Sequence, residues 1–152
     1  MHGDRHGFAA ALATERFVIQ LGDLTDHGPG SADVLSLMLA RLAVGTGLFL
    51  LGNHELKLAR ALAGCRVRLP PASLETVAAL DGSLRDQALG AIAVAPAWFR
   101  AGCSFFVHGA FHPGMLAGPP PPAPLKGRVP PLLARALYGQ TTGRTQPDGY
   151  PE

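Results

Sequence analysis

The sequence lacks the features that mark secreted, membrane and nucleic-acid-binding proteins. It has no apolar run near the roughly 18 residues that a membrane helix needs, and its start lacks the basic-then-apolar pattern of a signal segment. The only two cysteines, Cys65 and Cys103, lie far apart, so we expect buried, reduced thiols and a cytoplasmic protein rather than a disulfide framework. The 13 basic and 11 acidic residues nearly balance, and one tryptophan and two tyrosines offer little stacking surface beyond phenylalanine. The sequence therefore gives no strong signal for nucleic acid or a membrane surface.

Glycine and proline, by contrast, are abundant. The 19 glycines and 14 prolines make up more than a fifth of the 152 residues, which predicts many turns. Seven of the prolines fall within 119–131, and we expect 118–131 to be a Pro-rich loop. A hydrophobic content of 47% and this length suit one domain with a sizeable core, so we treat 1–152 as a single domain.

Short apolar runs alternate with helical patterns along the chain. The runs 17–21, 48–51 and 103–107 are typical of strands. Helices are predicted over 8–14, 32–44, 56–63, 73–80, 84–93 and 132–138, with Ser31 as the N-cap of the second. Because continuously apolar strands alternate with helices, the sequence predicts an α/β fold with a parallel sheet covered on both faces.

Histidine, acidic and amide side chains cluster in the chain, and three of the clusters directly follow a predicted strand. Ligand sites in open α/β sheets assemble at the carboxyl ends of strands, so these clusters are expected to converge at one edge of the sheet. The candidate residues are Asp4, His6, Asp23, Asp26, His27, Asn53, His54, His108 and His112.

Their chemistry favours a metal site, although each cluster alone has a simpler interpretation. Oxygen and nitrogen ligands without cysteine suit Mn²⁺, Fe or Zn²⁺, and a carboxylate such as Asp23 can bridge two ions about 3.5–4 Å apart that clamp a phosphoryl group. Gly-Asp and His-Gly pairs are also common in turns, which is the better interpretation of Asp4 and His6 taken alone. His112 fits either a rim residue that contacts substrate or a surface histidine. The clusters together, in this order, favour a metal site.

The series of motifs resembles the calcineurin-like metallophosphoesterases. It consists of Gly-Asp-Arg-His-Gly at 3–7, Gly-Asp-Leu-Thr-Asp-His-Gly-Pro at 22–29, Gly-Asn-His-Glu at 52–55 and Val-His-Gly at 107–109. It is most similar to the branch with phosphoprotein phosphatases, bacterial dinucleoside tetraphosphatases and the phosphatase module of bacterial polynucleotide kinase-phosphatase; 138–144 resembles a segment of the last group. The resemblance covers essentially the whole chain and implies the layered αββα sandwich of that family.

The resemblance also implies a mechanism. A hydroxide that bridges two divalent ions, most simply Mn²⁺ with Fe or Zn²⁺ as alternatives, would attack the phosphorus of a phosphorylated small molecule, protein or nucleotide. His54 would be the general acid, since an alkoxide is a poor leaving group and histidine titrates near neutral pH. Asp26 would orient the His54 ring. The first ion would be held by Asp4 and His6 and the second by Asn53 and His108, with Asp23 bridging both and with His27 and His112 near the substrate phosphate.

Three departures from the family pattern change the expectation. His27 stands where relatives usually carry an arginine that grips phosphate, so phosphate binding is expected to be weaker or more dependent on pH. Only three residues precede Asp4, where the family has an apolar strand, and no histidine follows His112 to complete the second metal site. We therefore expect a domain that is incomplete at both ends, without its first strand and its C-terminal strands. The alternative function is a catalytically impaired remnant that binds metal or a partner.

Overall fold

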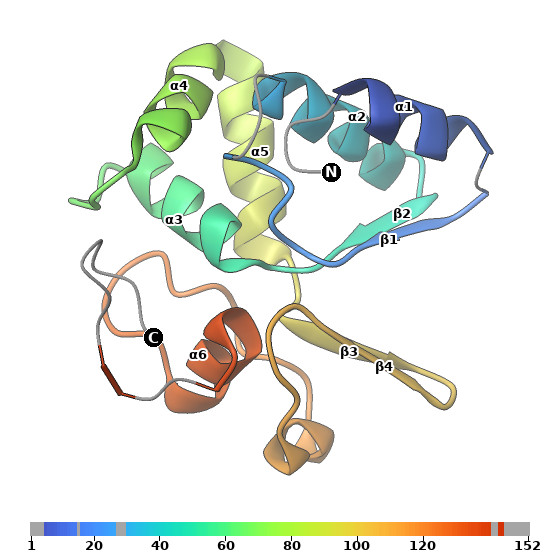
Figure 1. Cartoon of the computed structure of the whole chain (residues 1–152), viewed down its shortest axis with the longest axis vertical. Helices are drawn as coiled ribbons and strands as arrows, with labels where there is room; N and C mark the ends of the chain where they lie inside the picture. The colour runs from blue at the N-terminus through green and yellow to red at the C-terminus, as the bar shows by residue number, and fades with distance from the viewer. Residues whose placement is uncertain (1–4, 15, 27–29, 141–142, 145–152) are drawn as a thin grey trace.

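The computed structural model describes residues 5–14, 16–26, 30–140 and 143–144, and its fold is mixed α/β, as predicted (Figure 1). The elements in chain order are α1 (Arg5–Thr14), β1 (Val18–Gln20), α2 (Ser31–Ala43), β2 (Gly47–Phe49), α3 (Asn53–Leu62), α4 (Pro71–Ala79), α5 (Gly82–Val94), β3 (Trp98–Ala101), β4 (Ser104–Val107), the 3₁₀ helix η1 (Pro113–Ala117) and α6 (Pro131–Tyr138).

The described strands form two small sheets. β1 and β2 pair in parallel, with Ile19 opposite Leu48, as the alternation of strands and helices predicted. β3 and β4 form an antiparallel hairpin, with Phe99 opposite Phe106 and their rings stacked at a centroid distance of 4.7 Å. The strands predicted from the sequence do not include β3 at Trp98–Ala101. Pairing with β4 determines this strand, and such pairing is not visible in a local pattern.

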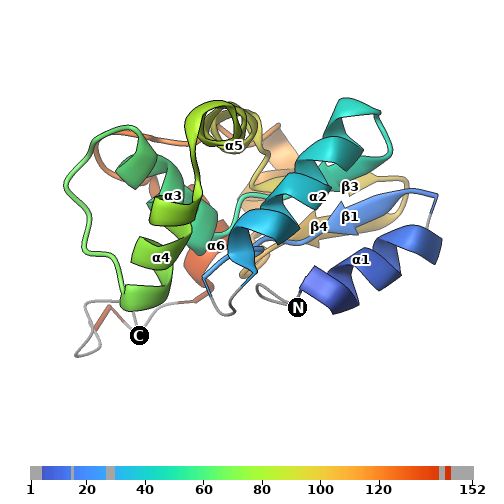
Figure 2. The ribbon, with the colours of Figure 1, turned by 90° about the horizontal axis from the view of Figure 1, so that it is seen from above.

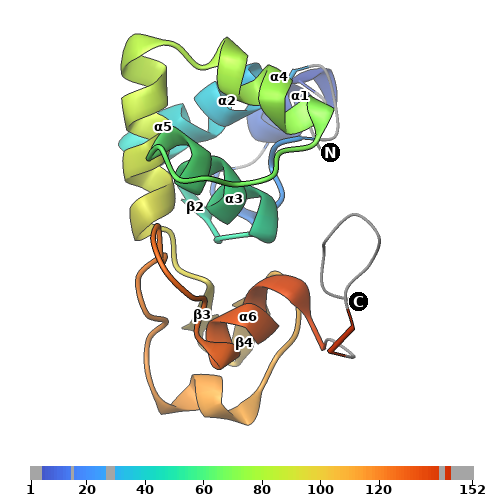
Figure 3. The same cartoon turned by 90° about the vertical axis from the view of Figure 1, so that its left-hand side faces the viewer.

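Helices α1, α4 and α5 pack against α2, α3 packs against α4 and α5, and the hairpin lies beyond these helices (Figure 2 and Figure 3). Figure 2 shows α2 between α1 on one side and α4 and α5 on the other, in agreement with the contacts among these helices. Figure 3 shows β3, β4 and α6 grouped below the helices. One buried apolar cluster nevertheless joins both groups, since it includes Leu51 and Leu58 as well as Trp98 and Leu137. The shared core is what brings the end of β4 to the ends of β1 and β2.

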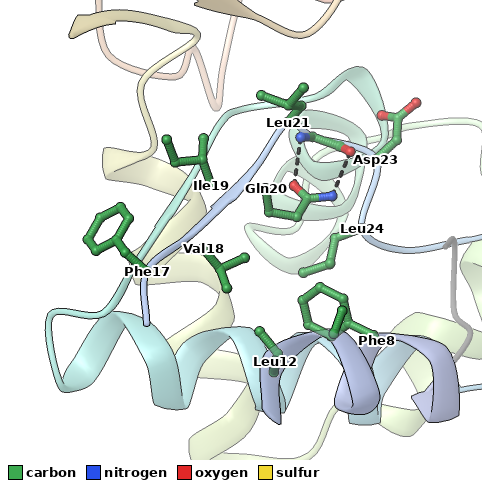
Figure 4. A pocket seen from close by; sticks show the side chains of 11 residues that line it. Phe8, Leu12, Phe17, Val18, Ile19, Gln20, Leu21, Asp23 and Leu24 are labelled. Atoms are coloured by element: carbon green, nitrogen blue, oxygen red, sulfur yellow. Dashed lines mark hydrogen bonds between the residues drawn. The ribbon is translucent and has the colours of Figure 1, made fainter. Parts of the chain in front are cut away.

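Within the described residues, α1 covers one face of β1, while side chains on the other face at both ends of the strand are exposed (Figure 4). Val18 points toward Leu12 of α1, across a hollow of about 450 Å³ between helix and strand (Figure 4). Phe17 and Leu21 point away from α1 and are 54% and 47% exposed. The expectation of helices on both faces is therefore wrong for β1 in the described part of the chain, because a pair of three-residue strands is too narrow to carry two helical layers.

Local details correct two further expectations. Gly30 rather than Ser31 is the N-cap of α2, and the Ser31 hydroxyl oxygen instead accepts a hydrogen bond from the amide of Asp26 at 3.0 Å.

Both cysteines are free thiols, as predicted, but neither is buried: Cys65 is half-buried, and Cys103 is exposed. Cys103 lies at the tight turn of the β3–β4 hairpin, next to Gly102, and such turns lie at the surface.

The Pro-rich segment forms no helix or strand before α6 begins at Pro131. It is held against α3 by the guanidinium of Arg60, which donates hydrogen bonds to the carbonyl oxygens of Pro124 and Gly127. Across the described ranges, no helix has the length and apolar character needed to cross a membrane.

Candidate active site

The ends of β1, β2 and β4 meet, and three predicted ligand residues come together there. Asp23 follows β1, Asn53 is the first residue of α3 after β2, and His108 follows β4. The Nε2 atom of His108 lies 3.3 Å from Oδ2 of Asp23 and 3.1 Å from Oδ1 of Asn53. Three segments far apart in the sequence therefore place one nitrogen and two oxygen atoms around a common point.

The backbone after β1 turns sharply to make this approach possible. Gly22, Asp23 and Asp26 have positive φ angles of 94°, 54° and 83°, a region that glycine adopts freely and aspartate tolerates better than most residues. A side chain at Gly22 would meet the ring of His108, because a Cβ atom there would lie 2.7 Å from Nδ1. The Gly-Asp pair, which is equally common in ordinary turns, here allows β1 and β4 to approach closely.

The ring of His108 is oriented as in a metal ligand. Its Nδ1 lies 2.8 Å from the carbonyl oxygen of Leu21 and donates a hydrogen bond to it, so Nε2 is the atom directed at Asp23 and Asn53. Metal-ligating histidines commonly use their second nitrogen in this way. Burial works against the charged ring, but the hydrogen bond and charge of Asp23 outweigh it and raise the pKa of His108. The two oxygens that face Nε2 can only accept hydrogen bonds or bind a cation. The three atoms are therefore stabilised either by a proton on Nε2 or by a cation between them.

His54 forms a second group beside the first. The hydrogen bond from its Nδ1 to Oδ2 of Asp26, at 3.0 Å, is the main cause of the raised pKa of His54. Oδ2 of Asp26 also accepts a 2.5 Å hydrogen bond from the hydroxyl of Ser73 in α4. Burial alone would raise the pKa of Asp26, which is 1% exposed, but these two donors lower it. The opposite nitrogen of the ring, Nε2, lies 4.0 Å from Oδ2 of Asp23 and thus faces the first group.

Asp23 lies between the two groups and supplies a negative charge to both. Its burial opposes ionisation, but the hydrogen bond from His108 and the charges of His108 and His54 lower its pKa. Its Oδ1 also accepts a hydrogen bond from the amide of His54 at 3.3 Å. Asp23 is therefore an anionic centre between two imidazole rings.

Glu55 is a site residue that the sequence reasoning missed. It is fully buried, and its carboxylate accepts hydrogen bonds from the amides of Asp23, Leu24 and Gly52. Burial and the nearby charge of Asp23 raise its pKa, and the amides of Asp23 and Leu24 only partly compensate. The available signal was the last residue of Gly-Asn-His-Glu, a charged side chain at a position where α3 turns toward the core.

Of the other four predicted residues, two lie apart from this arrangement and two are outside the described residues. His6 is exposed in the first turn of α1, and no hydrogen bond or ion pair joins it to the cluster. His112 is exposed as the N-cap of η1, where its Nδ1 accepts a hydrogen bond from the amide of Gly114, which favours the surface interpretation. Asp4 and His27 lie outside the described residues. Among His, Cys, Asp and Glu side chains in the described ranges, no group of three or more could hold a metal ion, so the candidate set depends on the amide oxygen of Asn53.

Gly52 offers a direct test of how tightly the two loops pack. A Cβ atom at this position would overlap Oε2 of Glu55 and lie 2.5 Å from the amide nitrogen of Asp23, although its backbone (φ −98°, ψ 171°) is open to any residue. We expect Gly52→Ala to lower the free energy of unfolding by about 1–3 kcal/mol, because the added methyl group forces the loops apart. Urea denaturation measures this change.

The matched control for this prediction is Gly90→Ala. Gly90 lies within α5, and a Cβ atom there meets nothing within 4 Å. This control is expected to raise stability by about 0.5–1 kcal/mol, since alanine is the better helix former. Equal stabilities for Gly52→Ala and the wild type would show that the two loops are not in close contact.

Comparison with known proteins shows the family of the chain. The family model described as calcineurin-like phosphoesterase matches residues 1–111, and the chain belongs to this family. Among curated proteins, the chain is 29% identical over 145 residues to a bis(5'-nucleosyl)-tetraphosphatase, PrpE (asymmetrical), of Halalkalibacterium halodurans. The alignment covers 90% of this chain and 55% of the relative, so the chain spans about half the length of the curated protein that it matches.

Proposed function

We propose that this chain is a metal-dependent phosphoesterase that hydrolyses a phosphate ester or anhydride. The observation that carries this proposal is the approach of His108 Nε2, Asp23 Oδ2 and Asn53 Oδ1 to one another at the ends of three strands. Membership of the calcineurin-like phosphoesterase family supports it. We also propose that the two small sheets are parts of the layered αββα sandwich that the motifs imply.

The donor set fits a divalent cation of intermediate hardness. Asp23, Asn53 and His108 would hold one ion, with Mn²⁺ the first choice and Fe or Zn²⁺ as alternatives. A second ion would be held by Asp23 together with Asp4 and His6, which requires His6 to move from its exposed position in α1 toward the cluster. Bound divalent ions supply Lewis-acid stabilisation of the phosphoryl oxygens and lower the pKa of bound water.

The side chains beside the metal ligands would hold and donate the proton that the leaving oxygen needs. His54 holds a proton on Nε2 and donates it to the leaving oxygen, while Asp26 accepts the hydrogen bond from Nδ1 and so fixes the ring and favours its charged form. Ser73 holds the same oxygen of Asp26 from α4. Because Asp26 and Ser73 are buried, the pair is shielded from competing water. His27 is proposed to contact the substrate phosphate.

The name of the curated relative suggests the first substrate to test. The relative is described as an asymmetrical bis(5'-nucleosyl)-tetraphosphatase, so we propose a dinucleoside polyphosphate as the physiological substrate class, with a phosphoanhydride as the bond cleaved.

Hydrolysis assays of the purified chain test the proposal. We expect Mn²⁺ to stimulate hydrolysis of p-nitrophenyl phosphate and of diadenosine tetraphosphate, and EDTA to remove this activity. Circular dichroism and a calorimetric titration of Mn²⁺ establish that the assayed protein is folded and loaded. Folded, loaded protein that hydrolyses neither compound would rule the enzyme out.

The competing function is a metal-binding remnant without catalysis. The observation that favours it is the exposed position of His6, outside the cluster around Asp23. Calorimetry separates the two functions, because the remnant predicts one strong Mn²⁺ site without turnover, whereas the enzyme predicts two sites with turnover.

A further inference from the structure

Glu55 connects the two loops that carry the candidate metal ligands. It lies in the first turn of α3, and none of its surface is exposed. Its Oε2 accepts hydrogen bonds from the amides of Asp23 at 2.7 Å and Gly52 at 3.1 Å, and its Oε1 accepts one from the amide of Leu24 at 2.6 Å. One side chain thus holds the backbone after β1 and the backbone after β2 at the same time.

Backbone amides compensate part of the cost of burying the Glu55 carboxylate. In the described part of the chain no ion pair reaches Glu55, and a buried carboxylate without partners is costly. The three hydrogen bonds to its two oxygens in the described structure all come from backbone N–H donors, so the geometry suits an ionised group that accepts on both oxygens. An amide side chain in its place would offer one acceptor oxygen and would turn an NH₂ group toward N–H donors.

The contacts of Glu55 act on the residue at the centre of the site. Its Oε2 holds the peptide nitrogen of Asp23, whose carboxylate faces His108 and Asn53. The adjoining hydrogen bond from the amide of His54 to Oδ1 of Asp23 is longer, at 3.3 Å, and links the same two segments. Gly52 allows this packing, because any side chain there would overlap the Glu55 carboxylate.

We propose that Glu55 is a positioning residue, whose carboxylate holds the Asp23 backbone against the start of α3 so that the Asp23 carboxylate reaches His108 and Asn53. Its effect on catalysis rests on the proposed function, whereas its effect on the Asp23 loop does not. A displacement of about 1 Å at a reacting group can cost roughly 100-fold in rate, so a loss of this anchor affects metal binding and turnover in a chain that remains folded.

The test compares Glu55→Gln with Glu75→Gln, a matched change on the exposed face of α4. In proton–nitrogen NMR spectra of the metal-free chain, we expect the amide protons of Asp23 and Leu24 to shift upfield and exchange faster in Glu55→Gln only. Calorimetry of the folded protein is expected to show Mn²⁺ affinity at least about 10-fold weaker. The kcat for p-nitrophenyl phosphate is expected to fall about 100-fold, while KM changes less.

The outcomes separate this proposal from the proposed function. Unchanged Asp23 and Leu24 amides, or Mn²⁺ affinity and kcat equal to those of Glu75→Gln, overturn the positioning role. If the wild type itself neither binds Mn²⁺ nor turns over substrate, the proposed function fails and the two amides alone decide the positioning role. If Glu55→Gln does not fold, Glu55→Asp serves instead, since it keeps the charge but is too short to reach both loops, and the same two amides must then shift.

Discussion

Asp23→Asn is expected to reduce Mn²⁺-stimulated hydrolysis by at least about 100-fold while leaving the chain folded. The carboxylate of Asp23 lies 3.3 Å from His108 Nε2 and 4.0 Å from His54 Nε2, and its low pKa keeps it ionised at neutral pH. Asparagine preserves its shape and the acceptor for the His54 amide but removes the negative charge. Steady-state rates with p-nitrophenyl phosphate at saturating Mn²⁺ measure the loss.

A matched substitution shows whether this loss is specific to the site. Asp86 is exposed on α5, and Asp86→Asn removes the same charge from the molecule. The control is expected to retain wild-type activity and Mn²⁺ affinity, whereas Asp23→Asn is expected to lose the calorimetric signal of tight Mn²⁺ binding. Wild-type rates in Asp23→Asn would remove Asp23 from the metal centre, and with it the central argument of the proposed function.

His54→Ala is expected to harm alkyl phosphates far more than p-nitrophenyl phosphate. The ring is held at Nδ1 by Asp26 and faces the site through Nε2, the position required of a proton donor. General acid catalysis contributes roughly 10²–10⁴-fold when the leaving group is an alkoxide, whereas p-nitrophenolate needs little protonation. Measuring kcat/KM for both substrates with the wild type and the variant gives the difference directly.

The role of His54 is identified by the difference in kcat/KM loss between the two substrates, rather than by the loss on either substrate alone. Asp26→Asn keeps a side chain next to the ring but removes the charge that supports it, and it is expected to give the same ordering of substrates with smaller losses. Equal losses on alkyl and p-nitrophenyl phosphates in His54→Ala would mean that His54 does not donate the proton.

Local sequence patterns were sufficient for most helices and for the two parallel strands. The apolar spacing in α2 and the continuous apolar runs at β1 and β2 reflect burial, which depends on nearby residues and repeats along an element. The strand β3 was missed, because only its pairing with β4 makes Trp98–Ala101 a strand. The burial of the cysteines and the cover on the outer face of β1 were predicted wrongly for the same reason, since both depend on distant segments.

The candidate site, like the fold, could be predicted from the sequence only in part. The ends of predicted strands correctly indicated that Asp23, Asn53 and His108 would meet, because the carboxyl ends of strands are a general location for sites in α/β folds. The sequence did not reveal that Glu55 holds two loops together, that Ser73 supports Asp26 from another helix, or that His6 lies apart on an exposed turn.

The sequence by itself determined the family of this protein, its α/β class and the kinds of side chain that can bind metal and donate a proton, because these follow from residue types and their order. Only the tertiary structure decided which of these side chains meet, in which direction each imidazole points and what holds each carboxylate. Those features depend on ångström-scale contacts between segments that lie 28 to 87 residues apart, and the packing of the shared core sets these distances.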